Sequence, residues 1–292
     1  MKKKLIVIYN PFSGGNKSIN LKEIFSKNIN QHAFDYEIWP TENANDLQLF
    51  VDKAIAIKPD IVVAAGGDGT INQIAEKLKN TDIALGFIPL GSGNGLARHF
   101  KIPLNIELAI QSLDKLKIKD IDTIWLNNHC IVNVGGVGFD AHVSSQFANL
   151  VNRGFWGYFK LIINNFWYKR QFYELFMDEK LVWSGKAFMI NIANATQWGN
   201  NIIVHKGALP DDGLINILIL KRFEFFQLPV LVNQLLKGTL YKNKNTITFV
   251  GTKFLLKREK EAFVHVDGEP ISLGKEINIK IEPLSLKILS NE

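Results

Sequence analysis

Cysteine is nearly absent from this sequence, which has only Cys130 among its 292 residues. A chain with one cysteine cannot form an intrachain disulfide, and this scarcity is typical of proteins in a reducing, cytoplasmic setting. Cys130 stands in the apolar segment HCIVNV, which indicates a buried small side chain rather than a nucleophile. The six histidines lack the H-x-x-x-H and H-E-x-x-H spacings of metal sites, so we expect structural or surface roles for them.

Long apolar runs are also absent, because no stretch approaches the roughly 18 residues that a membrane-spanning helix needs. The first residues, MKKKLIVIYNPF, imitate a signal peptide, but their apolar part is too short and Asn10-Pro11 ends it. We therefore expect a first β-strand behind a basic start.

A strong excess of one charge sign is missing, since 34 Lys and Arg residues against 28 Asp and Glu give a net charge of +6. An excess of this size serves solubility, and it also suits an anionic membrane surface. The basic clusters at 115–119, 241–244 and 257–260 lack the density of a nucleic-acid-binding tail, so no nucleic acid is expected as a partner. Composition does not define the oligomeric state, and a homodimer stays open.

The first 122 residues alternate short β-strand and helix patterns. DIVVAA at 60–65 is apolar on both faces, as central parallel strands are, and INQIAEKL at 71–78 places its apolar residues at helical spacing. Such alternation with short turns predicts an α/β domain with a doubly wound parallel sheet, covered by helices on both faces.

Residues 123–283 are rich in β-strand patterns, among them KAFMINIAN, LINILIL and INIKIEP, separated by turns that contain Asn, Gly and Asp. They predict an antiparallel β-sandwich or barrel-like domain. Two helical segments, 141–169 and 224–237, interrupt this domain. The last strand, within 284–292, is a candidate to return to the first domain.

Three glycine-rich loops follow strands of the first half: NPFSGG at 10–15, GGDGT at 66–70 and PLGSGNG at 89–95. Ligands of parallel α/β sheets bind beyond the carboxyl ends of the strands, and the amino ends of helices attract phosphate. Each loop alone fits an ordinary tight turn, but the three together predict a cradle for a polyphosphate. A carboxylate at Asp68 would repel phosphates unless it acts on Mg²⁺ or accepts a proton.

Several common nucleotide-binding templates are excluded. No G-x-x-x-x-G-K-[ST] P-loop is present, and GSGNGL has Leu96 where a dinucleotide-binding G-x-G-x-x-G needs its last glycine. The H-R-D and D-F-G motifs of protein kinases are missing as well.

Taken in order and spacing, the three loops and their flanks, GGDGTINQIAEKL and LGFIPLGSGNGLARHF, resemble the catalytic domain of the diacylglycerol kinase family. That family includes bacterial lipid kinases and sphingosine and ceramide kinases. The resemblance continues with VNVGGVGFDAHV, ALPDDGLINILIL and VDGEP, and it covers nearly the whole chain. It implies a nucleotide-binding domain at 1–122, similar to NAD kinases and phosphofructokinases, and a lipid-substrate β-sandwich domain at 123–283.

The resemblance also implies a reaction, the transfer of the ATP γ-phosphate to a lipid hydroxyl, with ATP and Mg²⁺ as cofactors. Glu269 matches the family's general base, and Asp122 resembles an aspartate tied to Mg²⁺ through water. The backbone of Leu209 and Leu214 and the carboxylate of Asp212 resemble a structural Mg²⁺ site of bacterial members. The implied nucleotide-site residues are Asn10, Ser13, Gly14, Gly66, Gly67, Asp68, Gly69, Thr70 and Ser92, with Thr41 as a secondary candidate.

One position departs from the family pattern, because many members have an aspartate where this sequence has Gly95. A magnesium-organising role there does not carry over, and diacylglycerol, a sphingoid base and a phosphatidylglycerol-like lipid all stay open as substrates. We place Glu269 as the base and Asp68 on the phosphate side, although the two roles could be reversed. The alternatives are an NAD-kinase-like enzyme with a soluble substrate and a non-catalytic lipid-binding or regulatory protein.

Two segments, 152–173 and 223–238, are dense in apolar residues and have two interpretations each. A core helix packed on the sheet is favoured for both. The alternative is an acyl-chain groove or a membrane-touching surface; in the first segment, Arg153, Lys160, Lys169 and Arg170 would meet anionic head groups. Together with a lipid substrate, this alternative predicts a cytoplasmic enzyme that works peripherally at the inner membrane face.

Overall fold

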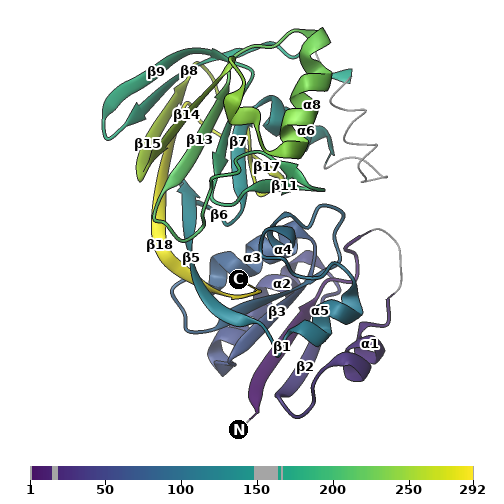
Figure 1. Ribbon diagram of the computed structural model, residues 1–292. Coiled ribbons are helices and arrows are strands. Elements are labelled where there is room, and N and C mark those ends of the chain that lie inside the picture. Colours follow the sequence, from purple (N-terminus) through teal and green to yellow (C-terminus); the bar gives the residue numbers. More distant parts are fainter. Residues whose placement is uncertain (1, 15–18, 148–163, 166, 292) are drawn as a thin grey trace. The chain divides into compact units, whose positions relative to one another are not determined.

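The computed structural model describes residues 2–14, 19–147, 164–165 and 167–291 (Figure 1). These residues form two compact units: unit 1 comprises Met1–Ile121 and Leu284–Glu292, and unit 2 comprises Asp122–Pro283. The division at 122 and 283 into separately folding domains stays a prediction. Most of the aromatic segment 152–173, with Arg153 and Lys160, lies outside the described residues.

Unit 1 is built around a parallel sheet with the strand order β2-β1-β3-β4. Its strands are β1 (Lys3–Tyr9), β2 (Phe34–Pro40), β3 (Ile61–Gly66) and β4 (Ala84–Pro89). Its helices are α1 (Leu21–Asn28), α2 (Ala44–Ile57), α3 (Asp68–Leu78), α4 (Gly95–His99) and α5 (Ile106–Ser112). The strands β3 and β4 are buried along their whole length, which explains their unbroken apolar runs.

Helices cover both faces of this sheet. The steps from β1 to β2 and from β2 to β3 run in opposite directions, so right-handed crossovers place α1 and α2 on opposite faces. Helix α2 packs against α3, and α1 packs against α5. The buried face of α3 carries Ile71, Ile74, Ala75 and Leu78, which are the apolar positions at helical spacing in the sequence.

The final strand belongs to both units. Strand β18 spans Glu276–Ser290, and its last part lies in unit 1, where Ile288 pairs in parallel with Leu85 of β4. Its first part lies in unit 2, where it pairs antiparallel with β15. Unit 1 therefore extends its sheet with residues that lie nearly two hundred positions after β4 in the sequence.

Unit 2 is a sandwich of two antiparallel sheets. One sheet has the order β14-β13-β10-β7-β16-β17, and the other contains β9, β8, β15 and the first part of β18. The strands of the first are β7 (Val134–Gly138), β10 (Met189–Ala193), β13 (Ile215–Leu220), β14 (Thr246–Gly251), β16 (Ala262–Val266) and β17 (Glu269–Leu273). Those of the second are β8 (Gln171–Met177), β9 (Lys180–Ala187) and β15 (Lys253–Arg258), and β5 (Lys117–Leu126) pairs with β18 and with β6 (His129–Ile131).

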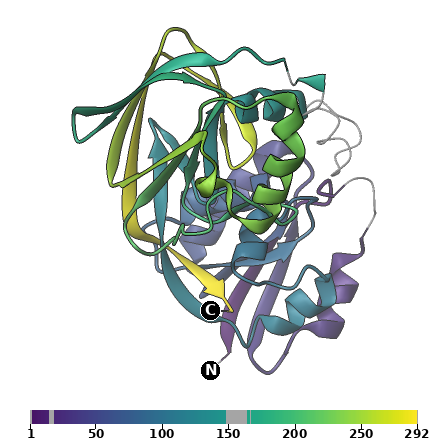
Figure 2. The ribbon, with the colours of Figure 1, turned by 45° about the horizontal axis from the view of Figure 1, so that its top comes forward.

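The central strands β7, β10 and β13 of the six-stranded sheet are buried along their whole length, which explains why β13 reads INILIL without polar alternation after its second residue. Ile217 and Ile219 enter the core between the two sheets. Leu218 and Leu220 enter a second apolar cluster on the other face. Helices α6 (Phe139–Phe147) and α8 (Leu228–Lys237) cover that outer face, as Figures 1 and 2 show.

The prediction that 223–238 is a core helix is wrong for most of its length. Within α8 only Leu231 is buried, whereas Val230 and Leu236 are 54% and 51% exposed, and Phe226, just before the helix, is 76% exposed. Leu231, which is buried, and Leu235, which is partly buried, pack on the sheet, but the sheet covers only part of the apolar side of the helix. The spacing of the apolar residues identifies that side and does not show how much of it the sheet covers. The remaining short elements are the 3₁₀ turns η1 (Phe225–Gln227) and η2 (Leu240–Lys242) and the hairpin of β11 (Gln197–Gly199) and β12 (Ile202–Ile203).

The parallel α/β unit and the antiparallel β-sandwich together are the fold class that the sequence predicts. Cys130 is buried in β6, also as predicted. In the described part of the chain, none of the helices combines the length and the apolar character needed to cross a membrane.

Candidate active site

The first two glycine-rich loops of unit 1 are bonded to each other. They follow β1 and β3, which are neighbours in the sheet, so both leave its carboxyl edge. The N–H of Gly67 donates to the Ser13 hydroxyl at 3.2 Å, and the Asn10 amide donates to the Thr70 hydroxyl at 3.2 Å. Side chains of loop 10–15 therefore fix the backbone and the hydroxyl of loop 66–70.

The aspartate of the second loop is bonded to the third loop. The two carboxylate oxygens of Asp68 accept the N–H groups of Asn94 and Gly95, each at 2.8 Å. Asp68 begins α3 and Gly95 begins α4, so one carboxylate holds backbone amides at the start of another helix. Within loop 89–95, the Asn94 amide donates to the Gly91 carbonyl at 2.8 Å, which fixes the loop internally.

Two glycines are required by how closely the three loops approach one another. Gly14 has a φ of +78°, and a Cβ there would lie 2.1 Å from the carbonyl oxygen of Leu90. A Cβ on Gly91 would lie 2.7 Å from the Cα of Gly67. Backbones that approach this closely leave their amides accessible to a bound anion rather than covered by side chains.

The amino end of α3 adds a positive partial charge to this cluster of loops. The helix begins directly in GGDGT, and its N-cap, Gly67, has no side chain to satisfy the first amides. Three glycine-rich loops and a helix amino end thus converge at the carboxyl edge of one sheet. Such an arrangement can bind the oxygen atoms of a polyphosphate.

The other predicted nucleotide-site residues of unit 1 have different surroundings. Thr41, which follows β2, is buried, and its N–H and hydroxyl both donate to the carbonyl of Tyr9, at 2.8 and 3.3 Å. Thr41 therefore lies beside the end of β1, where the first loop starts. Ser92 is exposed in the third loop.

In unit 2, Glu269 is the first residue of β17 and follows a tight turn formed by Asp267 and Gly268, whose φ angles are +48° and +92°. The Asp267 carboxylate accepts the backbone N–H groups of residues 132–134 at 2.8 to 3.0 Å. Glu269 is exposed, and in the described part of the chain its carboxylate has no hydrogen-bond partner. The turn is therefore held firmly while the Glu269 carboxylate stays available.

A buried pair that the sequence did not single out lies under the same turn. His265 and Asp140 contact each other at 3.2 Å between Nε2 and Oδ2, and their side chains are 3% and 2% exposed. The N–H of Gly268 lies 3.4 Å from Nδ1 of His265. The two residues are 125 positions apart, so only the fold of β7, α6 and β16 brings them together.

We expect replacement of Asp267 by asparagine to destabilise unit 2. An amide cannot accept three backbone N–H groups, because its nitrogen would face one of them. Loss of a hydrogen bond to a charged group costs about 1.5–3 kcal/mol, and for a unit of this size that lowers Tm by about 3–12 °C.

Asp178→Asn is the matched control for this prediction, measured by thermal unfolding. Asp178 also sits at positive φ in a hairpin turn of unit 2, but its side chain makes no hydrogen bond within the described residues. Equal Tm values for the two variants would contradict the role of Asp267.

The predicted metal residues of unit 2 come together in one loop. Asp122 is fully buried, its Oδ2 accepts the N–H of Gly213 at 2.8 Å, and its own N–H donates to the carbonyl of Pro210 at 2.6 Å. Asp212 accepts the N–H of Leu214 at 2.9 Å. Asp122 thus supports the loop 209–214 that carries the predicted ligands.

The donor atoms in this loop have the chemistry that magnesium prefers. Carboxylate and backbone carbonyl oxygens are hard ligands suited to Mg²⁺, and the loop offers no competing thiol. Among the described residues, no group of three or more His, Cys, Asp or Glu side chains is placed to hold a metal ion. A Mg²⁺ ion here would therefore depend on the carbonyls of Leu209 and Leu214 beside the carboxylate of Asp212.

Two family models match the chain. The model described as "Diacylglycerol kinase catalytic domain" matches residues 4–126. The model described as "YegS C-terminal NAD kinase beta sandwich-like domain" matches residues 133–290. The two matched ranges follow one another along the chain and together cover nearly the whole sequence.

Curated relatives and solved structures agree with these models. Proteins named "Probable lipid kinase YegS-like", from Yersinia pestis (strain Pestoides F) and Yersinia pseudotuberculosis serotype O:1b (strain IP 31758), are each 28% identical over 272 residues, which are 89% of this chain and 89% of theirs. A diacylglycerol kinase structure from Bacillus anthracis str. Sterne is 18% identical with a TM-score of 0.75, covering 99% of this chain and 97% of that one. An NAD kinase from Archaeoglobus fulgidus in complex with ATP is 16% identical with a TM-score of 0.54, covering 99% and 94%. The two structures share the fold of this chain.

Proposed function

Because the chain belongs to the diacylglycerol kinase catalytic-domain family of lipid kinases, we propose that it transfers the γ-phosphate of ATP to the hydroxyl group of a lipid. One observation carries the proposal most strongly. The Asp68 carboxylate holds the amides of Asn94 and Gly95 where three glycine-rich loops meet at the amino end of α3. Phosphoryl transfer depends mainly on such positioning of the phosphates and on neutralisation of their charge.

The nucleotide would bind at the loops of unit 1. Backbone amides of loops 10–15, 66–70 and 89–95 would hold the phosphate oxygens, as the amino end of a helix does in other nucleotide sites. The Archaeoglobus fulgidus NAD kinase of this fold was solved with ATP, which supports ATP as the phosphate donor. Bound Mg²⁺ supplies charge neutralisation on the phosphates, and the oxygen ligands around Asp212 would hold a structural ion in unit 2.

Glu269 would take the proton of the lipid hydroxyl. An alcohol is a poor nucleophile at neutral pH, so a carboxylate base within hydrogen-bond reach lowers the barrier. The carboxylate of Glu269 has no partner within the described residues, whereas both oxygens of Asp68 already accept backbone hydrogen bonds. This difference supports Glu269 as the base and Asp68 as the residue that orders the phosphate loops.

A labelled-phosphate assay tests the proposal. The full chain is incubated with γ-labelled ATP, Mg²⁺ and, in separate reactions, diacylglycerol, a sphingoid base, phosphatidylglycerol or NAD. We expect label in one of the lipids and none in NAD. Label in NAD alone would indicate a kinase for a soluble substrate, and label in no acceptor would indicate a non-catalytic protein.

A further inference from the structure

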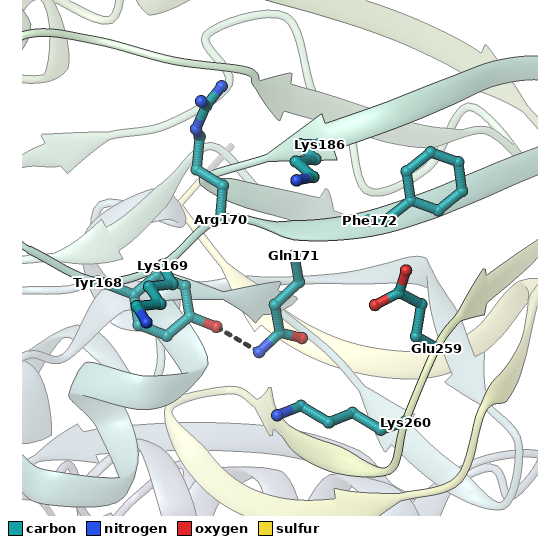
Figure 3. Close-up of a pocket in the computed structure, with 8 residues that line it drawn as sticks. All are labelled: Tyr168, Lys169, Arg170, Gln171, Phe172, Lys186, Glu259 and Lys260. Carbon is teal, nitrogen blue, oxygen red and sulfur yellow. Dashed lines mark hydrogen bonds between the residues drawn. The ribbon is translucent and has the colours of Figure 1, made fainter.

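Unit 2 contains a cavity of about 430 Å³ beside the start of β8 (Figure 3). Strands β8 and β9 contribute to it together with the segment before β8 and the turn after β15, because β8 lies between β15 and β9 in the sheet. Its lining residues are Tyr168, Lys169, Arg170, Gln171, Phe172, Lys186, Glu259 and Lys260.

The lining of this cavity carries an unbalanced charge. Four of its residues are cations, Lys169, Arg170, Lys186 and Lys260, against one carboxylate, Glu259. Within the residues that the structure describes, none of these four cations forms an ion pair. Several unpaired cations around one cavity repel each other, and a bound anion would remove that repulsion.

The side chain of Gln171, which lines the cavity, is held in place by hydrogen bonds. The Gln171 amide donates to the Tyr168 hydroxyl at 2.9 Å, and its carbonyl oxygen accepts the Tyr173 hydroxyl at 3.3 Å. Figure 3 shows the Gln171 amide and Lys260 pointing toward each other, with Lys169 on the same side of segment 168–172, whereas Arg170 extends away. The second amide hydrogen of Gln171 is therefore placed to donate beside two ammonium groups.

Tyr168 is itself held as a neutral phenol. Its pKa is raised to about 12, mainly by burial and also by the charge of Asp140, while Arg258 acts in the opposite direction. The ring packs against those of Phe139, His142 and Phe188. A hydroxyl that stays protonated adds no negative charge to the cavity, so Tyr168 does not repel a bound anion.

We propose that this cavity binds a phosphate ester, with Lys169, Lys260 and the Gln171 amide on its phosphate oxygens. A volume of about 430 Å³ exceeds that of a lone phosphate, so the cavity leaves room for the organic part of the ligand. The same chemistry is presented by an anionic phospholipid head group and by a soluble phosphate ester. Trp167, 87% exposed beside the cavity, favours the phospholipid, since Trp side chains settle at membrane interfaces.

Binding of vesicles tests the phospholipid source without nucleotide or acceptor, so the result does not depend on the proposed kinase activity. The full chain is titrated with vesicles of phosphatidylcholine with and without phosphatidylserine. We expect Lys169→Gln/Lys260→Gln to weaken binding to the phosphatidylserine vesicles by about 30-fold, because each basic residue near an anionic surface contributes about fivefold. Lys253→Gln/Lys280→Gln, on the same sheet, removes equal charge and is expected to weaken binding only slightly.

Calorimetry with glycerol 3-phosphate tests the soluble source. Binding that is lost in Lys169→Gln/Lys260→Gln and kept in the control pair would support the phosphate site with a soluble ester as its ligand. Equal losses in both pairs with vesicles would show general surface attraction and overturn the proposal, as would absence of binding to both probes. Glu269→Gln is expected to bind vesicles like the unmodified chain, which separates this cavity from the proposed reaction.

Discussion

Replacing Glu269 by glutamine is expected to lower kcat for lipid phosphorylation by about 10²- to 10⁴-fold, the usual contribution of a general base. Glutamine has nearly the same shape and cannot take a proton, and the Glu269 side chain contributes no hydrogen bond to the described structure. Folding should therefore be unaffected. The loops that would bind ATP belong to unit 1 and Glu269 to unit 2, so the KM for ATP should change little.

The measurement compares steady-state kinetics of Glu269→Gln and Glu261→Gln. Glu261 is an exposed carboxylate at the other end of the β16–β17 pair, where it accepts the hydroxyl of Ser272 at 2.7 Å. We expect near-normal turnover in the Glu261 variant. Near-normal turnover in Glu269→Gln as well would remove Glu269 from the mechanism.

Replacing Asp68 by asparagine is expected to weaken ATP binding about 10- to 150-fold and to lower activity with it. The variant keeps one acceptor oxygen but turns an NH₂ group toward the N–H of Asn94 or Gly95, which costs about 1.5–3 kcal/mol. The third loop would then separate from the second. Because these loops are proposed to hold the phosphates, the loss should appear in the dissociation constant of a non-hydrolysable ATP analogue, measured by calorimetry with Mg²⁺.

Asp60→Asn is the control for this prediction. Asp60 also accepts a backbone N–H, that of Lys4 at 2.6 Å, but it precedes β3 and so lies at the opposite edge of the sheet. We expect its nucleotide affinity to be unchanged. If Asp68→Asn bound the analogue normally and lost only kcat, Asp68 rather than Glu269 would be the proton acceptor.

The surroundings of Asp68 show which part of the candidate site could be predicted from the sequence. Parallel strands bring their carboxyl ends to one edge, so the convergence of the three loops follows from the positions of the strands alone. The partners of Asp68 do not follow, because they depend on how Asn94 and Gly95 turn in space. The glycine pattern located the candidate site, and only the fold showed that its aspartate is bonded to a neighbouring loop.

In unit 2, the contacts that could not be predicted from the sequence join residues that lie far apart along the chain. His265 meets Asp140, and Asp267 meets residues 132–134, across more than 120 positions. The spacing of apolar residues along the sequence does not indicate such pairs. The exposure of α8 was missed for another reason, since the spacing of its apolar residues shows which side is apolar and does not show how much of that side the sheet covers.

The division of β18 between the two units has a consequence for how the protein is made. Proteins usually fold their amino-terminal parts first as the chain leaves the ribosome. Here Ile288 must reach Leu85, and Lys287 must reach Asp82 and Asp120, before the sheet of unit 1 is complete. Unit 2 is therefore synthesised in full before unit 1 is complete, because residues 284–292 of unit 1 are made last. The sheet that carries the nucleotide loops is complete only when this last strand has been added.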